Sequence, residues 1–151
     1  KPVPSYYNNQ NFMGGYRTMN SKKAADSHTV MSEIVLLSST NGSGRLFGGQ
    51  IMSWMDIAGA ICAKRHCGCE VVTVSVDHLS FIKPAMPNDV VVLTADLESV
   101  GNTSMKIRIT AEIEPLGAGG TNERMLTSEA YFTYVAIGPD GRKRTVPRLE
   151  K

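Results

Sequence analysis

One acidic side chain stands out in residues 48–68, GGQIMSWMDIAGAICAKRHCG, because the segment around it is almost entirely apolar. The acid is Asp56, and no basic residue lies within one helical turn of it. An ionised carboxylate in apolar surroundings costs several kcal/mol unless it is paired or hydrogen-bonded. We therefore interpret Asp56 as a functional acid, which can act as a general base and activate a water molecule. The alternative is that Asp56 points into solvent at a gap in the core.

The loop before this segment, residues 40–49 (TNGSGRLFGG), is rich in glycine but does not match a phosphate-binding motif. A dinucleotide-binding loop needs glycine where Phe47 stands, and a P-loop needs Lys and then Ser or Thr after Gly49. The loop does bring the backbone N–H groups of Gly48, Gly49 and Gln50 to a helix N-terminus, where they can stabilise an oxyanion. A plain glycine turn into the helix is the alternative.

The other reactive side chains form no recognisable catalytic group. His78 follows Asp77 on a predicted strand, so the two side chains point to opposite faces and make a poor dyad. His66 lies at the predicted helix end, where we expect it to cap. No metal site is expected, because the paired spacing of a zinc site is missing from the four candidates Cys62, His66, Cys67 and Cys69. A water molecule activated by an acid is therefore the simplest chemistry.

The elements that must position Asp56 follow from the hydrophobic period. Residues 49–67 are predicted to form one helix, with cations in its last turn and glycine just beyond. Alternating apolar residues predict strands at 29–37, 70–84, 89–101, 103–115 and 124–138, separated by short turns. Such strands form an antiparallel sheet, and the single apolar helix must lie against one face of it. The predicted fold class is α+β, a curved antiparallel sheet wrapped around one long central helix, which is the hot-dog fold.

The predicted helix has two unlike faces. Large apolar residues, which suit the sheet, make up most of one face: Ile51, Trp54, Met55, Ala58, Ile61 and Cys62. Small or polar residues make up the other face: Gly49, Ser53, Asp56, Ala60 and Ala63. The second face leaves room for a ligand or for another backbone.

Composition places the chain among ordinary globular proteins. It has 151 residues, 42% hydrophobic and 20% charged, with a net charge of +2, so no nucleic-acid partner is expected. No apolar run reaches the roughly 18 residues of a membrane span. The three cysteines are clustered and odd in number, which favours the cytoplasm over an oxidising compartment. We expect a flexible or surface-draped arm over residues 1–28 and a single domain over 29–151 with a basic C-terminal tail.

The pattern N-x-x-G-x-x-F-G-G-x-x-M-x-x-M-D-x-A-G-A-I over residues 41–61 resembles the signature of hot-dog acyl-CoA thioesterases of the bacterial YciA type, which are related to animal cytosolic acyl-CoA hydrolases. The segments VVTVSVDHLSFIKPA, VGNTSMKI and FTYVAIGPDGRKRTVP extend the resemblance over about residues 29–147. It implies hydrolysis of fatty acyl-CoA to a fatty acid and coenzyme A, with no cofactor beyond the coenzyme A of the substrate. It also implies a homodimer with active sites at the interface, usually assembled as a trimer of dimers.

The resemblance also implies roles for particular residues. Asp56 matches the catalytic acid, as general base or nucleophile, and Asn41 matches an asparagine that the opposite subunit supplies to position water or substrate. Gly49 matches the helix start that receives the thioester oxygen, next to Gly48. Substrate contacts are expected from Ser53 on the small face, which leaves room for the acyl chain or the pantetheine arm, and from Asn102, Thr103 and Ser104. The cations Arg142, Lys143 and Arg144 are expected to meet the phosphates of coenzyme A, unless they form only a solvated tail.

Three other functions compete with this hypothesis. A dehydratase acting on acyl carrier protein would need a His facing an acid, and no His precedes Asp56 in the helix segment. A non-catalytic acyl-CoA binding or sensor module is the alternative function. Sensors on this fold carry a DNA-binding segment, and residues 1–28 are too short and polar for one. A purely structural oligomer leaves Asp56 and Asn41 unexplained.

Overall fold

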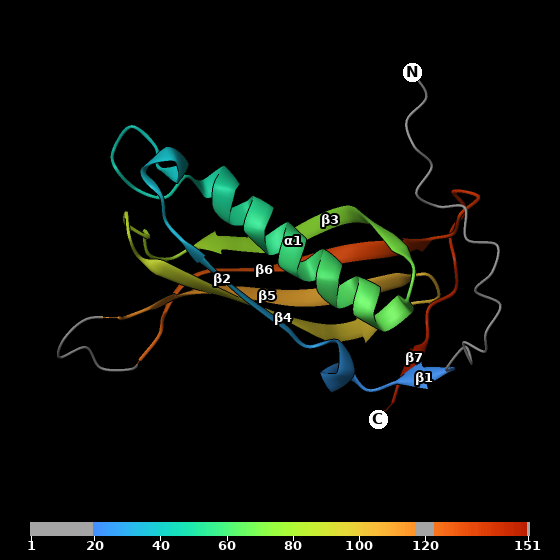
Figure 1. Ribbon diagram of the computed structural model, residues 1–151. Helices are drawn as coiled ribbons and strands as arrows, with labels where there is room; N and C mark the ends of the chain where they lie inside the picture. The colour runs from blue at the N-terminus through green and yellow to red at the C-terminus, as the bar shows by residue number, and fades with distance from the viewer. Residues whose placement is uncertain (1–19, 117–122, 151) are drawn as a thin grey trace, which may run out of the picture.

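The computed structural model describes residues 20–116 and 123–150, which form one long helix packed on a five-stranded antiparallel sheet (Figure 1). The helix is α1 (Gly48–Cys67). The strand order in the sheet is β2-β4-β5-β6-β3. The bounds of the strands are β2 Thr29–Ile34, β3 Glu70–Phe81, β4 Val90–Val100, β5 Ser104–Glu114 and β6 Met125–Ile137. The predicted hot-dog fold is confirmed.

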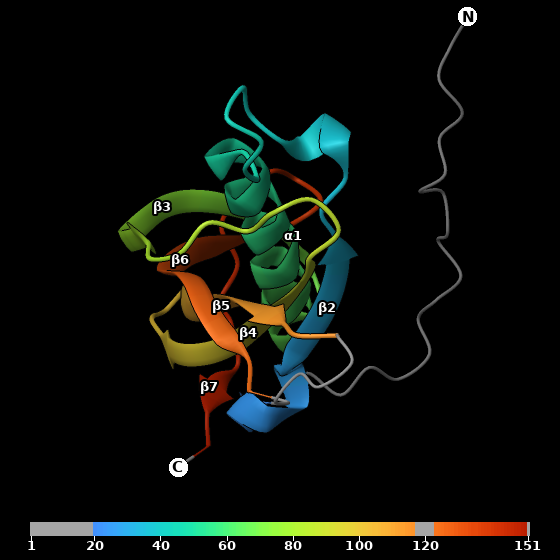
Figure 2. The same ribbon diagram turned by 90° about the vertical axis from the view of Figure 1, so that its left-hand side faces the viewer.

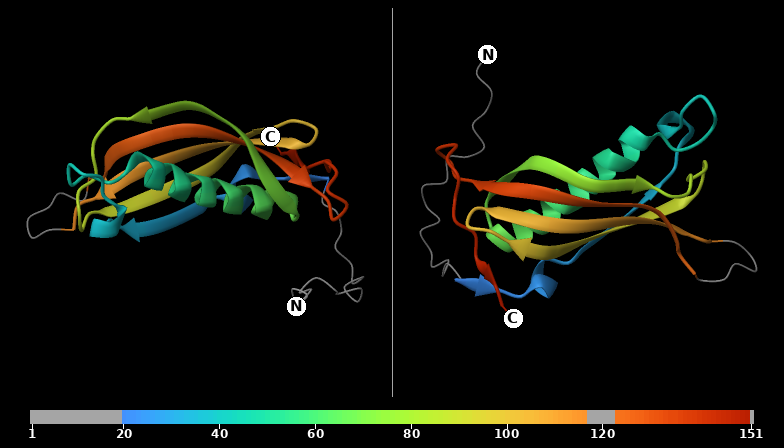
Figure 3. Two further views of the ribbon diagram at one scale, coloured as in Figure 1. Left: turned by 90° about the horizontal axis from the view of Figure 1, so that it is seen from above. Right: turned by 180° about the vertical axis from the view of Figure 1, so that it is seen from behind.

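The sheet curves around the helix, so that α1 lies along its concave face. Figure 2 looks toward one end of the helix, with β3 on one side of α1 and β2 on the other. The two views in Figure 3 show the same curvature from above and from behind. Strand alternation explains the core, because every second side chain of the central strands faces the helix. These inward side chains include Leu93, Ile107, Ile109 and Phe132, all at most 2% exposed.

The helix follows from its apolar face and from a well-made C-terminus. Met55, Ala58 and Cys62 are fully buried against the sheet. Gly68 ends the helix in the left-handed conformation (φ 68°), and its N–H donates to the carbonyl of Lys64. Two predicted details differ, since Ala63 is buried and Ile61 is only partly buried. The small Ala63 allows the helix to approach the sheet closely there.

Two short elements precede β2, where the sequence predicted only an arm. β1 (Ser21–Lys22) pairs in parallel with β7 (Arg148–Leu149), and the 3₁₀ helix η1 (Ala24–Ser27) follows it. A second 3₁₀ helix, η2 (Leu37–Ser39), occupies the end of the strand predicted at 29–37. The rest of the predicted arm, residues 1–19, lies outside the described residues. Among the residues that are described, no helix has both the length and the apolar character needed to cross a membrane.

Candidate active site

The Asp56 carboxylate is held by two hydroxyl groups from the sheet. Thr73 donates a hydrogen bond of 2.7 Å to Oδ1 of Asp56, and Tyr134 donates one of 3.0 Å to the same oxygen. Thr73 and Tyr134 are cross-strand partners in β3 and β6, so their side chains leave the same face of the sheet. No cation in the described part of the chain pairs with Asp56, which is half-buried. Neither hydrogen bond uses Oδ2, which is left for a water molecule or a substrate.

Tyr134 reaches the helix because the residue above its ring is glycine. Its side chain is fully buried, and its hydroxyl also donates 2.9 Å to the backbone carbonyl of Asp56. A Cβ at Gly59 would lie only 2.9 Å from Cε2 of Tyr134 and 2.7 Å from Cδ1 of Ile109. Burial, together with the Asp56 carboxylate, raises the pKa of Tyr134 above its ordinary value. The phenol therefore stays protonated and remains a hydrogen-bond donor.

Thr73 and Tyr134 are two site residues that the sequence did not predict. Nothing in the alternation of residues 70–84 separates Thr73 from its neighbours. One feature of the sequence could have identified Tyr134. It alternates along β6 with the buried residues Ala130, Phe132 and Ala136, and it is the only one of the four with a polar group. A buried tyrosine hydroxyl needs a partner, and here that partner is the acid that the helix sequence left unpaired.

The N-terminus of α1 presents two free N–H groups rather than three. Phe47 is the N-cap and makes no capping hydrogen bond through its side chain. The N–H of Gln50 donates to the carbonyl of Phe47 at 2.9 Å, so its predicted role as an oxyanion donor is wrong. The N–H groups of Gly48 and Gly49 have no acceptor within the described ranges. Any side chain at Gly49 would meet the Phe47 ring, since a Cβ would lie 2.5 Å from it.

Asn41 shapes the loop before the helix and does not contact Asp56 in this chain. Its Oδ1 accepts hydrogen bonds from the N–H and hydroxyl of Ser43, at 3.0 Å each, and from the N–H of Arg45 at 3.3 Å. Asn41 and Gly48 both line a cavity of about 340 Å³ at this end of the helix, together with Phe81. The predicted asparagine and one of the predicted oxyanion donors, Gly48, therefore line the same cavity.

All the remaining predicted residues except Ser53 gather at the other end of α1. The N–H of Val146 donates to the carbonyl of Asn102 and the N–H of Ala136 to that of Thr103, each at 3.0 Å. These bonds bring the β4–β5 turn, with Asn102, Thr103 and Ser104, to the segment that carries Arg142, Lys143 and Arg144, three exposed cations. Ser53 lies exposed on α1, one turn before Asp56.

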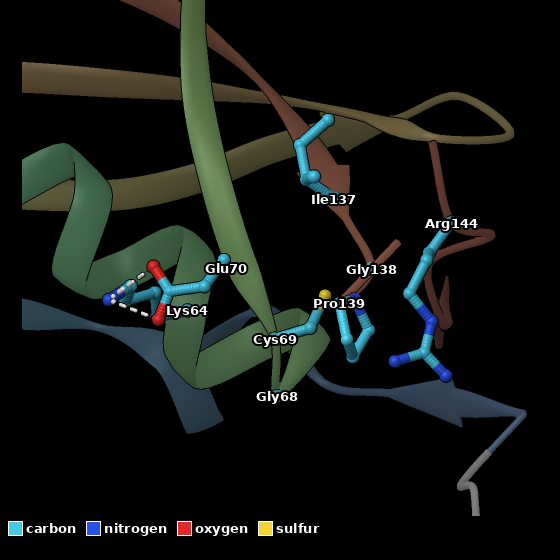
Figure 4. Close-up of a pocket in the computed structure, with 8 residues that line it drawn as sticks. All are labelled: Lys64, Gly68, Cys69, Glu70, Ile137, Gly138, Pro139 and Arg144. Atoms are coloured by element: carbon cyan, nitrogen blue, oxygen red, sulfur yellow. Dashed lines mark hydrogen bonds and ion pairs between the residues drawn. The ribbon is translucent and has the colours of Figure 1, made fainter. Parts of the chain in front are cut away.

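A cavity of about 750 Å³ lies at this C-terminal end (Figure 4). The residues that line it are Lys64, Gly68, Cys69, Glu70, Ile137, Gly138, Pro139 and Arg144. Lys64 and Glu70 form an ion pair of 3.0 Å, and the guanidinium of Arg144 lies across from them in Figure 4. The cavity therefore carries one more positive charge than negative.

Two histidine predictions change with the structure. His66 does not cap α1: its ring is buried, and its Nε2 lies 2.7 Å from the carbonyl of Pro147. Lys22 from β1 takes the capping role, donating to the carbonyls of Arg65 and His66. His78 has a positive φ of 52° at an irregularity in β3, so simple alternation with Asp77 does not hold.

Known proteins resemble this chain in both sequence and structure. The thioesterase superfamily model matches residues 43–119. The acyl-CoA thioester hydrolase YciA of Escherichia coli is 37% identical over 118 residues, which are 78% of this chain and 89% of that protein. A structure of a hexameric broad-specificity acyl-coenzyme A thioesterase is 39% identical, with a TM-score of 0.74, covering 78% of this chain and 85% of the other.

An acyl-CoA hydrolase from Staphylococcus aureus gives a closer structural match at lower identity. Its complex with butyryl coenzyme A, coenzyme A and coenzyme A disulfide has a TM-score of 0.81 and 29% identity, covering 86% of this chain and 77% of that one. Structures of the same enzyme exist with an asparagine, an aspartate or a threonine replaced by alanine. With the family model matching half of its length and relatives nearly 40% identical over most of it, this chain belongs to the thioesterase superfamily.

Proposed function

We propose that the protein hydrolyses fatty acyl-CoA thioesters to a free acid and coenzyme A, with the Asp56 carboxylate as its reactive group. The observation that carries this proposal is the fixed carboxylate: the hydroxyls of Thr73 and Tyr134 hold Asp56 by Oδ1, and neither of these hydrogen bonds uses Oδ2. As general base, Oδ2 takes a proton from water as the water attacks the thioester carbon. As nucleophile, it attacks that carbon itself and forms an anhydride that water then opens. In both routes the thiolate of coenzyme A leaves and is protonated.

The tetrahedral oxyanion needs hydrogen-bond donors, and we assign them to Gly48 and Gly49 of the partner subunit. Seven residues separate Gly49 from Asp56, which is about 10 Å along one helix, too far for one carbonyl group to meet both directly. Asn41 lines the same wall as Gly48. A subunit that supplies Asn41 to its neighbour's site therefore supplies the N–H donors as well.

The exposed edge of β3 supports such a dimer. β3 is an edge strand of twelve residues, and its Val72, Val74 and Val76 are 46%, 54% and 37% exposed. A long apolar edge strand is a template for pairing with another chain. Two β3 edges related by a two-fold axis would set the two helices antiparallel, with the start of one beside the C-terminal half of the other. A trimer of such dimers would give the hexamer described for relatives.

The spacing of three residues supports the assignment of roles. The asparagine, aspartate and threonine replaced in the Staphylococcus aureus enzyme are separated along that chain just as Asn41, Asp56 and Thr73 are separated here. We therefore add Thr73 to the proposed site, as the hydroxyl that orients Asp56 or its water.

Coenzyme A would extend from Asp56 toward the C-terminal end of α1. Lys64 lies two turns beyond Asp56, about 12 Å along the axis, at the edge of the larger cavity. There Arg142, Lys143 and Arg144 can meet the phosphates, and Asn102, Thr103 and Ser104 can border the pantetheine. Cys62, Cys67 and Cys69 are all free thiols, which suits a cytoplasmic setting.

The test is thiol release from acyl-CoA substrates of increasing chain length. We expect turnover by the native protein and a loss of about a hundredfold or more in kcat for Asp56→Asn, the range of a general base. Glu123→Gln, an exposed acid just before β6, is the matched control and should keep full activity. If the native protein binds coenzyme A but releases no thiol from any substrate, the non-catalytic acyl-CoA binding module replaces this proposal.

A further inference from the structure

Two thiols meet at the C-terminal end of α1, outside the proposed catalytic group. Cys67 is the last residue of the helix and Cys69 lies just before β3, with Gly68 between them. The S–H of Cys69 donates to Sγ of Cys67 at 3.2 Å, and the Cys67 thiol lies 3.5 Å from the carbonyl of Cys69. The proposed hydrolysis uses neither thiol.

The backbone at Gly68 sets a Cα separation between Cys67 and Cys69 that lies within the range of a disulfide. Gly68 is in the left-handed helical conformation, with φ 68° and ψ 23°. Helical geometry of either hand places residues i and i+2 about 5.4 Å apart at Cα, for a rise of 1.5 Å and a radius of 2.3 Å. Disulfide-linked Cα atoms lie about 4.4–6.8 Å apart. Bond formation therefore asks the two sulfurs to approach by about 1 Å, which side-chain rotation can provide.

The two thiols differ in their access to small molecules. Cys69 lines the cavity of about 750 Å³, and Figure 4 shows its sulfur directed toward Pro139 at the cavity wall. Burial raises the pKa of Cys67 to about 12, and the hydrogen bond with Cys69 adds to this effect. Cys67 therefore stays protonated, and Cys69 is the thiol that meets an incoming reagent first.

A metal site explains this pair less well. Two thiolates are half of a tetrahedral zinc site, and His66, the nearest imidazole in sequence, is turned to Pro147. No group of three or more His, Cys, Asp or Glu residues suited to a metal occurs within residues 20–116 and 123–150.

We propose that Cys67 and Cys69 form a dithiol site that exchanges with small-molecule disulfides. The Cys69 thiolate attacks one sulfur of the disulfide, the S–S bond breaks, and the first small thiol leaves with a proton. Cys67 then gives up its proton and attacks Sγ of Cys69, which releases the second small thiol. One disulfide is reduced to two thiols while the protein gains one Cys67–Cys69 disulfide, so electrons and protons balance.

The experiment treats the folded native protein with oxidised glutathione and follows its intact mass. We expect the final product to have lost the mass of two hydrogen atoms and to carry no glutathione. Cleavage after Arg65 should then give one peptide that contains both oxidised cysteines and lacks Cys62. This readout needs no acyl-CoA turnover, so failure of the proposed hydrolysis leaves it unaffected.

Three serine variants fix the order of events. Cys67→Ser should stop at a stable glutathione adduct on Cys69, whereas Cys69→Ser should react at least about tenfold more slowly than the native protein. Cys62→Ser is the control and should behave as the native protein, because Cys62 is fully buried. The proposal is overturned if the native protein stops at a mixed disulfide or does not react, or if Cys69→Ser reacts at the native rate.

Discussion

The two ends of α1 differ in how completely the chain satisfies them. At the C-terminal end, Lys22 donates to the carbonyls of Arg65 and His66, at 2.9 and 3.2 Å, and Gly68 closes the last turn. At the N-terminal end, the N–H groups of Gly48 and Gly49 find no acceptor in the described part of the chain. Helix ends need partners for their free backbone groups. The carbonyls at the C-terminal end are therefore satisfied within the chain, whereas the N–H groups at the N-terminal end are available to a ligand or a second subunit.

The side chains around each end show the same contrast. Phe47 and Phe81 beside the N-terminus are each 57% exposed, whereas His66 at the C-terminus is buried against the tail. Exposed aromatic rings next to free N–H groups suit an apolar acyl group with a polar head. The two free N–H groups and Asp56 thus lie at separate places along one helix, as the proposed dimeric site requires.

Mixing two inactive variants tests that conclusion with the largest expected effect. Asp56→Ala and Asn41→Ala should each abolish most of the activity as homodimers. In a dimer of one of each, one site has both residues intact, so random 1:1 assembly should recover about a quarter of the native activity. Co-expressed subunits with two different tags allow the mixed dimer to be isolated and assayed. A mixed dimer as inactive as its parents would mean that each site lies within one chain.

Tyr134→Phe should have the next largest effect, because it removes one of the two donors to Asp56. We expect about a tenfold fall in kcat with little change in KM, since the carboxylate is held less well while substrate contacts remain.

Tyr131→Phe provides the control for that change. It deletes the same hydroxyl from the same strand, three residues away, and Tyr131 faces Lys106 instead of the helix. Its kcat should match that of the native protein. An unchanged kcat for Tyr134→Phe would reduce Tyr134 to a packing role.

Hydrophobic period predicted the fold well, because burial sets the period of every long element. The helix at 49–67 and the four strands after it agree with the structure to within a few residues. The short β1 and η1 were missed, since two-residue pairing with β7 leaves no periodic pattern in the sequence. The predicted thioesterase family is confirmed by the relatives.

The site was only partly predictable, for a physical reason. Asp56 stood out because an unpaired acid in an apolar helix is costly. Its partners did not, because Thr73 and Tyr134 come together only through the register of β3 on β6. The predictions for Gln50 and His66 were wrong for a similar reason. The N–H of Gln50 bonds within the first turn of the helix, and the ring of His66 bonds to the carbonyl of Pro147, which is distant in sequence.

Arg144→Ala should affect binding and leave chemistry unchanged. Arg144 is exposed at the larger cavity, so loss of one phosphate contact should raise KM for acyl-CoA about two- to fivefold, as for exposed ion pairs, with kcat constant. The effect should shrink at high salt because exposed charges are screened. Arg124→Ala is the matched control. Arg124 lies just before β6, whereas Arg144 lies beyond the end of β6, so this variant should have the KM of the native protein. A fall in kcat with an unchanged KM would contradict the assignment to coenzyme A.

The smallest expected effect is on the pH dependence of stability, through His66 at the C-terminal end of α1. Burial lowers the pKa of His66 below its ordinary value, although the hydrogen bond to Pro147 opposes this. The unfolded chain therefore binds a proton from about pH 6.5 downward while the folded protein does not, so stability is full above that pH and falls as the pH drops below it. His66→Gln keeps an N–H for the carbonyl of Pro147 and does not titrate. Thermal unfolding of both proteins between pH 5 and pH 7.5 should give Tm values that differ least at the top of the range, with the native protein losing more on acidification. If the Tm of both proteins changes equally with pH, His66 binds its proton equally in the folded and unfolded chains, and burial does not lower its pKa.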